Sequence, residues 1–416
     1  MTPLSALLGR EFRTGPDMEP TSLRRVISLP LLILYGLGTM LGAGIYALIG
    51  EVAGEAGVLA PWSFVAAAVL AGLTGLSFAE FSSRLPKAAG EAAYVNAGFP
   101  GAPLALIVGL LVATSGVVSA GVMLDSFVGY SGAFFAAPAW LKTLSLTLFI
   151  GAVAAWGIAE SLAIVALVTV LEVGALLVVV TLGIAAPTHD VPMPTTAGNL
   201  VGVLSGTVLA FYAFIGFEDM VNVAEEVRRP RRTVPIAIFV SIGVAAALYA
   251  VVAIVAVRVV STDALAASPE PMALILSSVS SIPPIWMNAV AIVALVNGAL
   301  VQVVMASRVL FGLADRNLLP KSYAVVNQRT KTPLRATLLV CLLIFAASAM
   351  LPLGTLAKLT SLVLLIVFTL INIALIRVKR RKSEDGQAFE VFEFLPWIAA
   401  IGTSGLAVVS MVSLVR

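Results

Sequence analysis

Charged residues are scarce in this 416-residue chain. Asp, Glu, Lys and Arg together make up 11% of it, whereas 60% of the residues are hydrophobic. A soluble domain carries about 25% charged residues. With a mean hydropathy of +1.06, the chain has too little polar surface to cover a water-soluble fold of this length. The composition therefore predicts an all-α polytopic membrane protein.

Cysteine and histidine are almost absent. The single cysteine, Cys341, excludes a disulfide within the chain. The single histidine, His189, lies between Pro187 and Pro192 in a polar connector, where a solvated side chain is the expected state. No set of catalytic groups can be assembled from these residues, so we expect neither an enzyme nor a metal site or cofactor.

Long apolar runs are abundant. A transmembrane helix needs about 20 mostly apolar residues, and the first of the runs is too long to be a cleaved signal peptide. The sequence predicts eleven spans: 29–52, 61–83, 103–134, 140–157, 161–185, 199–224, 234–257, 284–312, 335–351, 356–376 and 394–415.

Lysines and arginines are concentrated in every second connector between these spans. With a cytoplasmic N-terminus, 21 of the 25 lysines and arginines fall on the cytoplasmic side. This bias is the usual determinant of membrane orientation. It predicts a multi-pass protein of the cell (inner or plasma) membrane with its N-terminus inside and its C-terminus outside. Because orientation accounts for the basic clusters, they do not indicate a nucleic-acid partner.

The first span contains the glycine-rich stretch GTMLGAGIY, residues 38–46. Two interpretations stay open. Gly38 and Gly42 form a G-x-x-x-G pair, which is a common contact motif between membrane helices. Alternatively, the helix unwinds at Gly42, Ala43 and Gly44, and its free amides bind a carboxylate at the start of the second half-helix.

The sixth span carries a second glycine interruption. It reads FYAFIGFED over residues 211–219, with Gly216 near its middle followed by Glu218 and Asp219. Ionisable groups within a membrane are costly and usually functional. Spans one and six are corresponding members of two five-helix halves, and such paired interruptions are typical of inverted-repeat transporters.

Several motifs identify the chain as resembling the amino acid–polyamine–organocation permeases, in particular bacterial relatives of cationic amino acid transporters. They are GTMLGAGIY, LSFAEFSSRLPKAAGEAAYV (76–95), FYAFIGFEDMVNVAEEVRRPRRTVPIAI (211–238) and SRVLFGLADRNLLPKSYAVVN (307–327). The resemblance implies a five-plus-five inverted-repeat fold with discontinuous helices one and six. It divides the chain into a cytoplasmic N-terminus (1–28), two repeats (29–186 and 187–376), and a cytoplasmic loop with a final transmembrane helix (377–416).

The resemblance also implies roles for individual residues. The substrate carboxylate is expected at the amides of Gly42, Ala43 and Gly44, and the α-amino group at carbonyls around Tyr212, Ala213 and Ile215. Tyr212 matches an aromatic gate, with helix packing as the alternative. Glu80 and Arg84 match an intracellular gate, and Glu218 matches a carboxylate used in coupling.

Glu172 departs from the family pattern, because many proton-coupled relatives carry a lysine at this place in the fifth span. Three explanations remain open. A protonated Glu172 donates a hydrogen bond to carbonyls of the first span; it helps to hold a cation; or it is purely structural. The segment 297–301 of the eighth span offers no hydroxyl, so we expect transport to be sodium-independent.

Together these observations predict a secondary active transporter of L-amino acids that is proton-coupled and works by alternating access in the lipid bilayer. The alternative is a polyamine or cationic amino acid exchanger. The sequence leaves open which amino acid is carried, whether transport is symport or exchange, and the oligomeric state.

Overall fold

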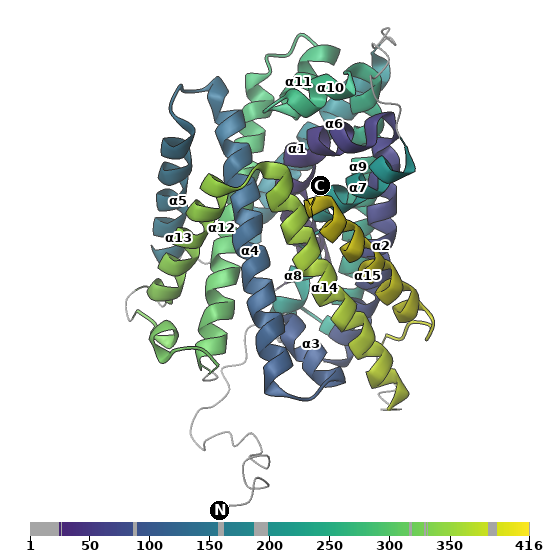
Figure 1. The fold of residues 1–416 in the computed structure, drawn as a ribbon, viewed down its shortest axis with the longest axis vertical. Helices are drawn as coiled ribbons and strands as arrows, with labels where there is room; N and C mark the ends of the chain where they lie inside the picture. Colours follow the sequence, from purple (N-terminus) through teal and green to yellow (C-terminus); the bar gives the residue numbers. More distant parts are fainter. Residues whose placement is uncertain are drawn as a thin grey trace, which may run out of the picture.

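A computed structural model describes residue 25 and residues 27–85, 90–156, 162–186, 199–315, 318–327, 330, 332–381 and 389–415. Within these residues the fold is helical, as predicted. Its longest helices stand side by side (Figure 1). They are α1 (Leu29–Ala56), α2 (Ala60–Arg84), α4 (Ala102–Tyr130), α5 (Ala139–Trp156), α6 (Leu162–Ala185), α9 (Pro230–Val259), α12 (Ile285–Asp315), α13 (Leu334–Met350), α14 (Leu353–Arg380) and α15 (Leu395–Val415).

Each of the eleven predicted spans corresponds to a described helix or, for the sixth span, to the pair α7 (Leu200–Tyr212) and α8 (Asp219–Asn222). Eight stretches of the described residues are long and apolar enough to cross a membrane. Three shorter apolar segments are also helical: Leu29–Gly42, which is the first half of α1, Leu200–Tyr212 and Leu334–Met350. The chain is therefore a polytopic membrane protein.

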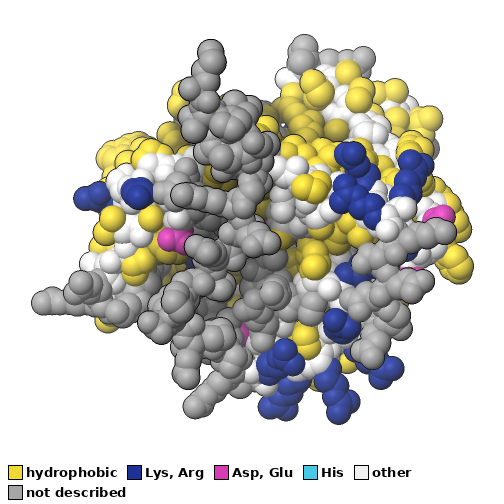
Figure 2. All heavy atoms as spheres, turned by 90° about the horizontal axis from the view of Figure 1, so that it is seen from below, with side chains coloured by type: hydrophobic (Ala, Val, Ile, Leu, Met, Phe, Trp, Pro, Cys, Tyr) yellow, Lys and Arg dark blue, Asp and Glu magenta, His cyan; other side chains and the backbone are white. Residues whose placement is uncertain are grey.

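Short helices cover the two ends of the bundle. α3 (Gly90–Gly98) lies at the lower end in Figure 1, and α10 (Thr262–Ala267) and α11 (Pro271–Val279) lie at the upper end. Lysines and arginines gather on the lower face, as Figure 2 shows. This distribution agrees with a lower face that is cytoplasmic, because basic residues favour the cytoplasmic side of a membrane.

Helix α1 forms the centre of the bundle, in contact with α6, α7, α9 and α12. Its middle is almost wholly buried. Membrane helices associate through close packing of small residues, since lipid tails are as apolar as the side chains. The glycines of α1 fit this rule: a Cβ at Gly42 would stand 3.3 Å from the carbonyl oxygen of Ala294, and one at Gly44 only 2.6 Å from the Cα of Ala213.

Candidate functional site

The sixth span is broken at its predicted position. α7 ends at Tyr212, a turn covers residues 213–218, and α8 begins at Asp219. Within the turn, each amide from Ala213 to Ile215 donates to the carbonyl three residues earlier, at 3.0 Å. No hydrogen bond to the carbonyl oxygens of Phe214 and Ile215 is found among the described residues. Both acceptors lie in the interior, and Ile215 lines the two small cavities described below.

Gly216 fixes the geometry of this break. Its φ is +120°, a conformation that side chains with a Cβ rarely adopt. A Cβ there would also stand 2.8 Å from the carbonyl carbon of Thr39 in α1. The amide of Gly216 donates to Oε2 of Glu218 at 2.8 Å, and its carbonyl accepts from Oγ1 of Thr39 at 3.0 Å. Glu218 therefore holds the break in shape.

The predicted interruption of the first span is absent from this structure. α1 is an α-helix throughout Leu29–Ala56, across Gly42, Ala43 and Gly44. The close-packing interpretation of its glycines is the one that the structure supports. Keeping the helix intact satisfies its amides within the apolar interior, and the lack of a Cβ at Gly44 admits the end of α7. The amides of residues 42–44 are consequently not free to bind a carboxylate in this conformation.

Two tyrosines connect the break to its neighbours. The Tyr249 hydroxyl of α9 lies 2.8 Å from the Met40 carbonyl oxygen and 3.0 Å from that of Ala213. It thereby links α1 to the break and occupies one of the carbonyls predicted to bind the α-amino group. The Tyr212 hydroxyl lies 2.8 Å from Oγ of Ser119 in α4. Tyr212 thus closes the inner end of the site against α4.

Glu172 in α6 is fully buried, with no exposed surface. Both of its carboxyl oxygens lack a hydrogen-bond partner among the described residues. The carboxyl group interacts electrostatically with the hydroxyls of Tyr46 and Tyr249, and Tyr46 donates to the Glu172 backbone carbonyl at 3.1 Å. Glu172 therefore faces the centre of the bundle near the break. Of the three explanations left open for Glu172, the hydrogen bond from its carboxyl group to carbonyls of α1 is not formed in this conformation.

A second group of carboxyls lies on the cytoplasmic side of the break. Glu218 interacts electrostatically with Asp219 and with Glu91 of α3. Glu91 lies outside the spans, yet only 5% of it is exposed. Burial raises the pKa of its carboxyl group from the usual 4.5 to about 7. This carboxyl can consequently gain or lose a proton near neutral pH.

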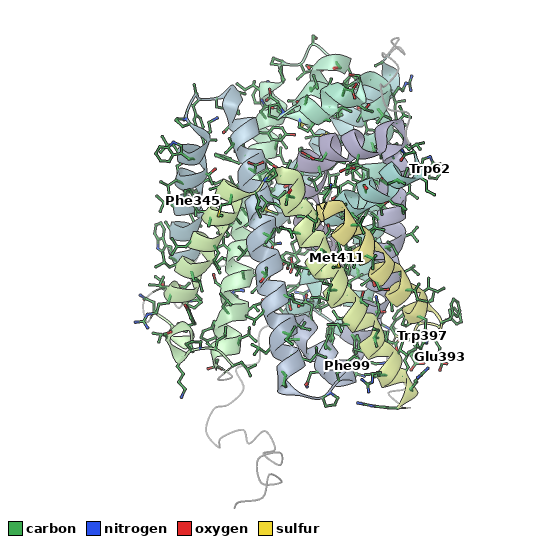
Figure 3. The ribbon with its side chains drawn as sticks, in the orientation of Figure 1. Trp62, Phe99, Phe345, Glu393, Trp397 and Met411 are labelled. Carbon is green, nitrogen blue, oxygen red and sulfur yellow. The ribbon has the colours of Figure 1, made fainter. Side chains whose placement is uncertain are left out.

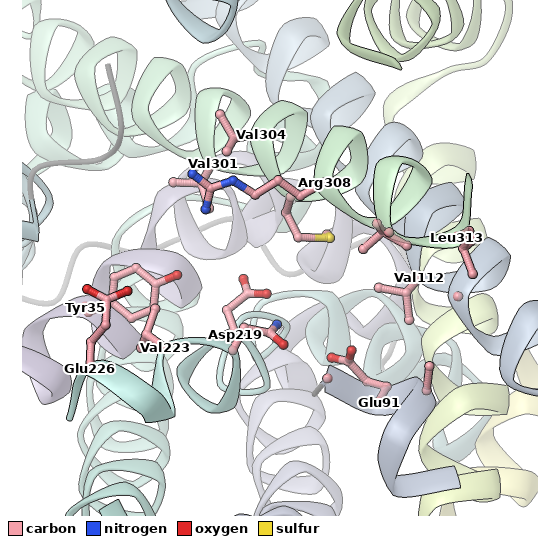
Figure 4. Close-up of a pocket in the computed structure, with 17 residues that line it drawn as sticks. Tyr35, Glu91, Val112, Asp219, Val223, Glu226, Val301, Val304, Arg308 and Leu313 are labelled. Carbon is pink, nitrogen blue, oxygen red and sulfur yellow. The ribbon is translucent and has the colours of Figure 1, made fainter. Parts of the chain in front are cut away.

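Glu91 and Asp219 line a cytoplasmic vestibule, a cavity of about 330 Å³ between α3, α4, α8 and α12 (Figure 4). Two cavities of about 10 Å³ continue inward, each with room for about one water molecule. The nearer is lined by Glu91, Glu218 and Ser119, among others. The farther lies between Ser119, Tyr212 and Gly44. Shared lining residues therefore place the two small cavities in sequence between the vestibule and the break.

The opposite end of the bundle is closed over α1. Tyr130 of α4 donates to the carbonyl of Tyr46 at 2.7 Å, and the amide of Met272 in α11 donates to the Tyr130 hydroxyl at 3.3 Å. Leu265 of α10 and Met272 are fully buried beneath this cover. Among the described residues, the vestibule therefore lies toward the basic face, whereas α10 and α11 cover the opposite end of α1.

The gate candidates Glu80 and Arg84 lie apart from the vestibule wall. Arg84 pairs with Glu80 at 2.8 Å and with Glu390 at 3.0 Å, and Lys379 of α14 pairs with Glu80 at 2.9 Å. Glu80 also accepts from the Val391 amide at 2.9 Å. This network ties the cytoplasmic end of α2 to α14 and to the segment before α15.

Three side chains that lie around the break were not predicted as site residues from the sequence. Gln302 of α12 and Ser119 of α4 line both small cavities, and Tyr249 links α1 to the break. Gln302 and Ser119 look like ordinary polar residues of apolar helices. A hydroxyl or amide inside a long span is the only signal that marks them. The facing direction that brings them together depends on helix packing.

The sequence of this chain matches a known protein family. The family model described as "Amino acid permease" matches residues 27–416. The chain therefore belongs to the amino acid permease family. The relatives that it resembles are transporters and not enzymes. It is a multi-pass membrane protein, as the sequence predicts.

Curated relatives are distant. The chain is 28% identical to the mitochondrial cationic amino acid transporter 3 of Arabidopsis thaliana, over 81% of this chain and 61% of that protein. It is 30% identical to the vacuolar cationic amino acid transporter 2 of the same plant, over 76% and 53%. It is 28% identical to the branched-chain amino acid permease BcaP of Bacillus subtilis, over 81% and 77%. The chain thus spans between about half and three-fifths of the length of these two plant relatives.

Proposed function

We propose that this protein is a secondary active transporter that carries L-amino acids across the cell membrane by alternating access. One observation carries the proposal: at the sixth-span break the Ile215 carbonyl accepts no hydrogen bond among the described residues, and Ile215 lines two small cavities that lie inward of the cytoplasmic vestibule. Family membership supports it, as do the names of the relatives. We further propose that residues 29–186 and 187–376 form the two inverted repeats. Their relative movement opens the substrate site to each side of the membrane in turn.

The substrate occupies the space between α1 and the break. Its α-amino group meets the Ile215 carbonyl, which is free, whereas those of Tyr212 and Ala213 already accept hydrogen bonds. Its carboxylate meets amides of Gly42, Ala43 and Gly44, which requires α1 to unwind when the substrate binds. The cavity beside Gly44 is too small for an amino acid in the present conformation. Binding therefore includes a rearrangement of α1, and Tyr212 moves as a gate.

Coupling to protons involves Glu172 and Glu218. An ionised carboxylate buried without a partner costs several kcal/mol, and Glu172 has no hydrogen-bond donor of its own. The site therefore calls for a proton or a cation on Glu172. Glu218 lies between the break and Glu91, which is the direction in which a proton released toward the cytoplasm would travel.

Uptake into proteoliposomes in sodium-free buffer tests this proposal. We expect an inward proton gradient to stimulate uptake of at least one labelled L-amino acid. In Glu172→Gln, which carries no titratable carboxyl, we expect the stimulation to fall by about tenfold, while exchange against preloaded amino acid continues. The matched control is Glu393→Gln, which removes an exposed carboxyl and should change neither.

Three outcomes would contradict parts of the proposal. Unchanged gradient stimulation in Glu172→Gln excludes this residue from coupling. Uptake only into preloaded vesicles, with no effect of the gradient, identifies an exchanger. A preference for putrescine or arginine in that case favours the polyamine or cationic amino acid alternative, which the carboxyl groups of the vestibule support.

A further inference from the structure

The vestibule has walls of opposite charge. Glu91 of α3, Asp219 of α8 and Glu226 of the turn after α8 supply three carboxyl groups on one side of the cavity. Arg308 of α12 supplies a guanidinium group across from them, as Figure 4 shows. Among the described lining residues the distribution is asymmetric, since one cation faces three acidic side chains. A ligand that matches it carries one anionic group and more than one cationic group.

Glu91 is the strongest indication of a ligand. It is 95% buried, its carboxyl group points into the cavity in Figure 4, and within the described residues it bonds only to its own backbone amide. A buried carboxyl group without a cationic partner carries a desolvation cost, which a bound cation would offset. Arg308 is exposed and forms no ion pair within the described part of the chain. Both groups are thus available to a ligand.

The size of the cavity is adequate. Its volume of about 330 Å³ lies at the lower end of the range of about 300–1,000 Å³ that is usual for small-molecule sites. The two cavities that lead inward are each about 10 Å³. A molecule in the vestibule is therefore separated from the break by a constriction that it cannot pass without a conformational change.

We propose that the vestibule is a second amino acid site, at the cytoplasmic mouth, that holds an L-amino acid with a cationic side chain. Its α-carboxylate pairs with Arg308, and its ammonium and side-chain cation pair with Glu91 and Glu226. This proposal rests on the proposed function, because the site would receive a substrate released from the break or deliver one to it. It differs from the central site in position, in charge and in the residues that form it.

Equilibrium binding to the purified full-length chain at pH 8, where Glu91 is ionised, tests the site. The probes are L-arginine and agmatine, which is the same molecule without the carboxylate. We expect Arg308→Gln to weaken L-arginine binding at least tenfold and to leave agmatine within about twofold. Glu91→Gln should weaken both probes at least tenfold. The matched controls Arg335→Gln and Glu393→Gln remove charges elsewhere and should change neither.

A second variant separates the vestibule from the central site. Ser119→Leu fills the small cavities next to the break, so we expect it to stop uptake and yet to preserve L-arginine binding. Loss of that binding in Ser119→Leu, with an unaltered elution profile, would place the ligand at the break and overturn the proposal.

A different result would identify a simple gate. If Arg308→Gln and Glu91→Gln change the rate of uptake but not the affinity for L-arginine, the charged residues of the vestibule act only in gating. The second site then does not exist. The proposed function is tested separately by uptake. Absence of uptake with every L-amino acid would remove it, whatever binds in the vestibule.

Discussion

Two glycine-containing segments, one in α1 and one in the sixth span, differ in their structure. Both lie at the middle of a span, yet α1 stays helical through Gly42 and Gly44 while the sixth span breaks around Gly216. The difference lies in what each segment contacts. Gly216 has a positive φ, and both of its backbone polar groups have partners outside a helix. The α1 glycines instead provide space for neighbouring backbones.

This contrast shows that glycine permits a break without causing one. A non-helical segment in a membrane has to satisfy its amides and carbonyls within the protein. Glu218 and Thr39 do so at Gly216. At Gly42–Gly44 the helix itself satisfies the backbone, so a substrate carboxylate is the kind of partner that would make unwinding favourable. In the proposed transport cycle, the central site is therefore half formed before the substrate arrives.

The largest expected effect follows from Gly216→Ala. The new Cβ would clash with the backbone of Thr39 at 2.8 Å in a strained conformation. We expect a loss of more than about 3 kcal/mol of stability, seen as aggregation during size-exclusion chromatography. Gly243→Ala is the matched control, since a Cβ there meets nothing within 4 Å. A monodisperse Gly216→Ala protein with normal uptake would show that the break tolerates a side chain.

A smaller loss of stability is expected when glycines of α1 are replaced by alanine, and this loss differs between Gly42 and Gly44. Gly44→Ala brings a Cβ within 2.6 Å of Ala213, whereas Gly42→Ala approaches Ala294 only to 3.3 Å. We expect Gly44→Ala to cost about 1–3 kcal/mol and Gly42→Ala less than about 1 kcal/mol, measured as thermal stability.

Uptake by the Gly42→Ala variant tests whether α1 unwinds during transport. Alanine resists unwinding more than glycine does, by about 1 kcal/mol. If α1 unwinds during transport, Gly42→Ala lowers the uptake rate several-fold at nearly unchanged stability. Unaltered uptake would mean that α1 remains a helix throughout the cycle, and that the substrate carboxylate binds elsewhere.

The smallest expected effect concerns the bond that joins the two segments. Tyr249→Phe removes the hydroxyl that lies between the carbonyls of Met40 and Ala213. A hydrogen bond of this kind contributes about 0.5–1.5 kcal/mol, so we expect a modest fall in melting temperature. Tyr323→Phe, in the connector after α12, is the control. Equal melting temperatures for both variants would show that Tyr249 does not stabilise this arrangement of α1 and the break.

Much of the fold could be predicted because each span is long and apolar. The eleven predicted segments match described helices to within a few residues, apart from extensions such as those of α9 and α14. Large apolar side chains such as Trp62, Trp397 and Met411 are exposed, as a lipid-facing surface requires, and Trp62 and Trp397 lie at the edge of the molecule in Figure 3. The sixth-span break was also predictable, since Glu218 and Asp219 follow Gly216 by two and three residues.

The site could be predicted only in part. Tyr212, Ala213, Ile215 and Glu218 do meet at the break, but Glu80 and Arg84 form a network away from the vestibule. The state of α1 depends on whether the space around Gly44 is filled by Ala213, which involves residues about 170 positions apart in the sequence. No local pattern reports such a contact.

The sequence by itself therefore determined the membrane setting, the spans and the position of one break, because hydropathy, charge bias and glycine position act locally along the chain. The tertiary structure alone decided that α1 is intact, that Glu172 has no hydrogen-bond partner among the described residues, and that Glu91 and Arg308 face the same cavity. These features depend on which faces of distant helices meet, and that choice is made by packing across the whole bundle.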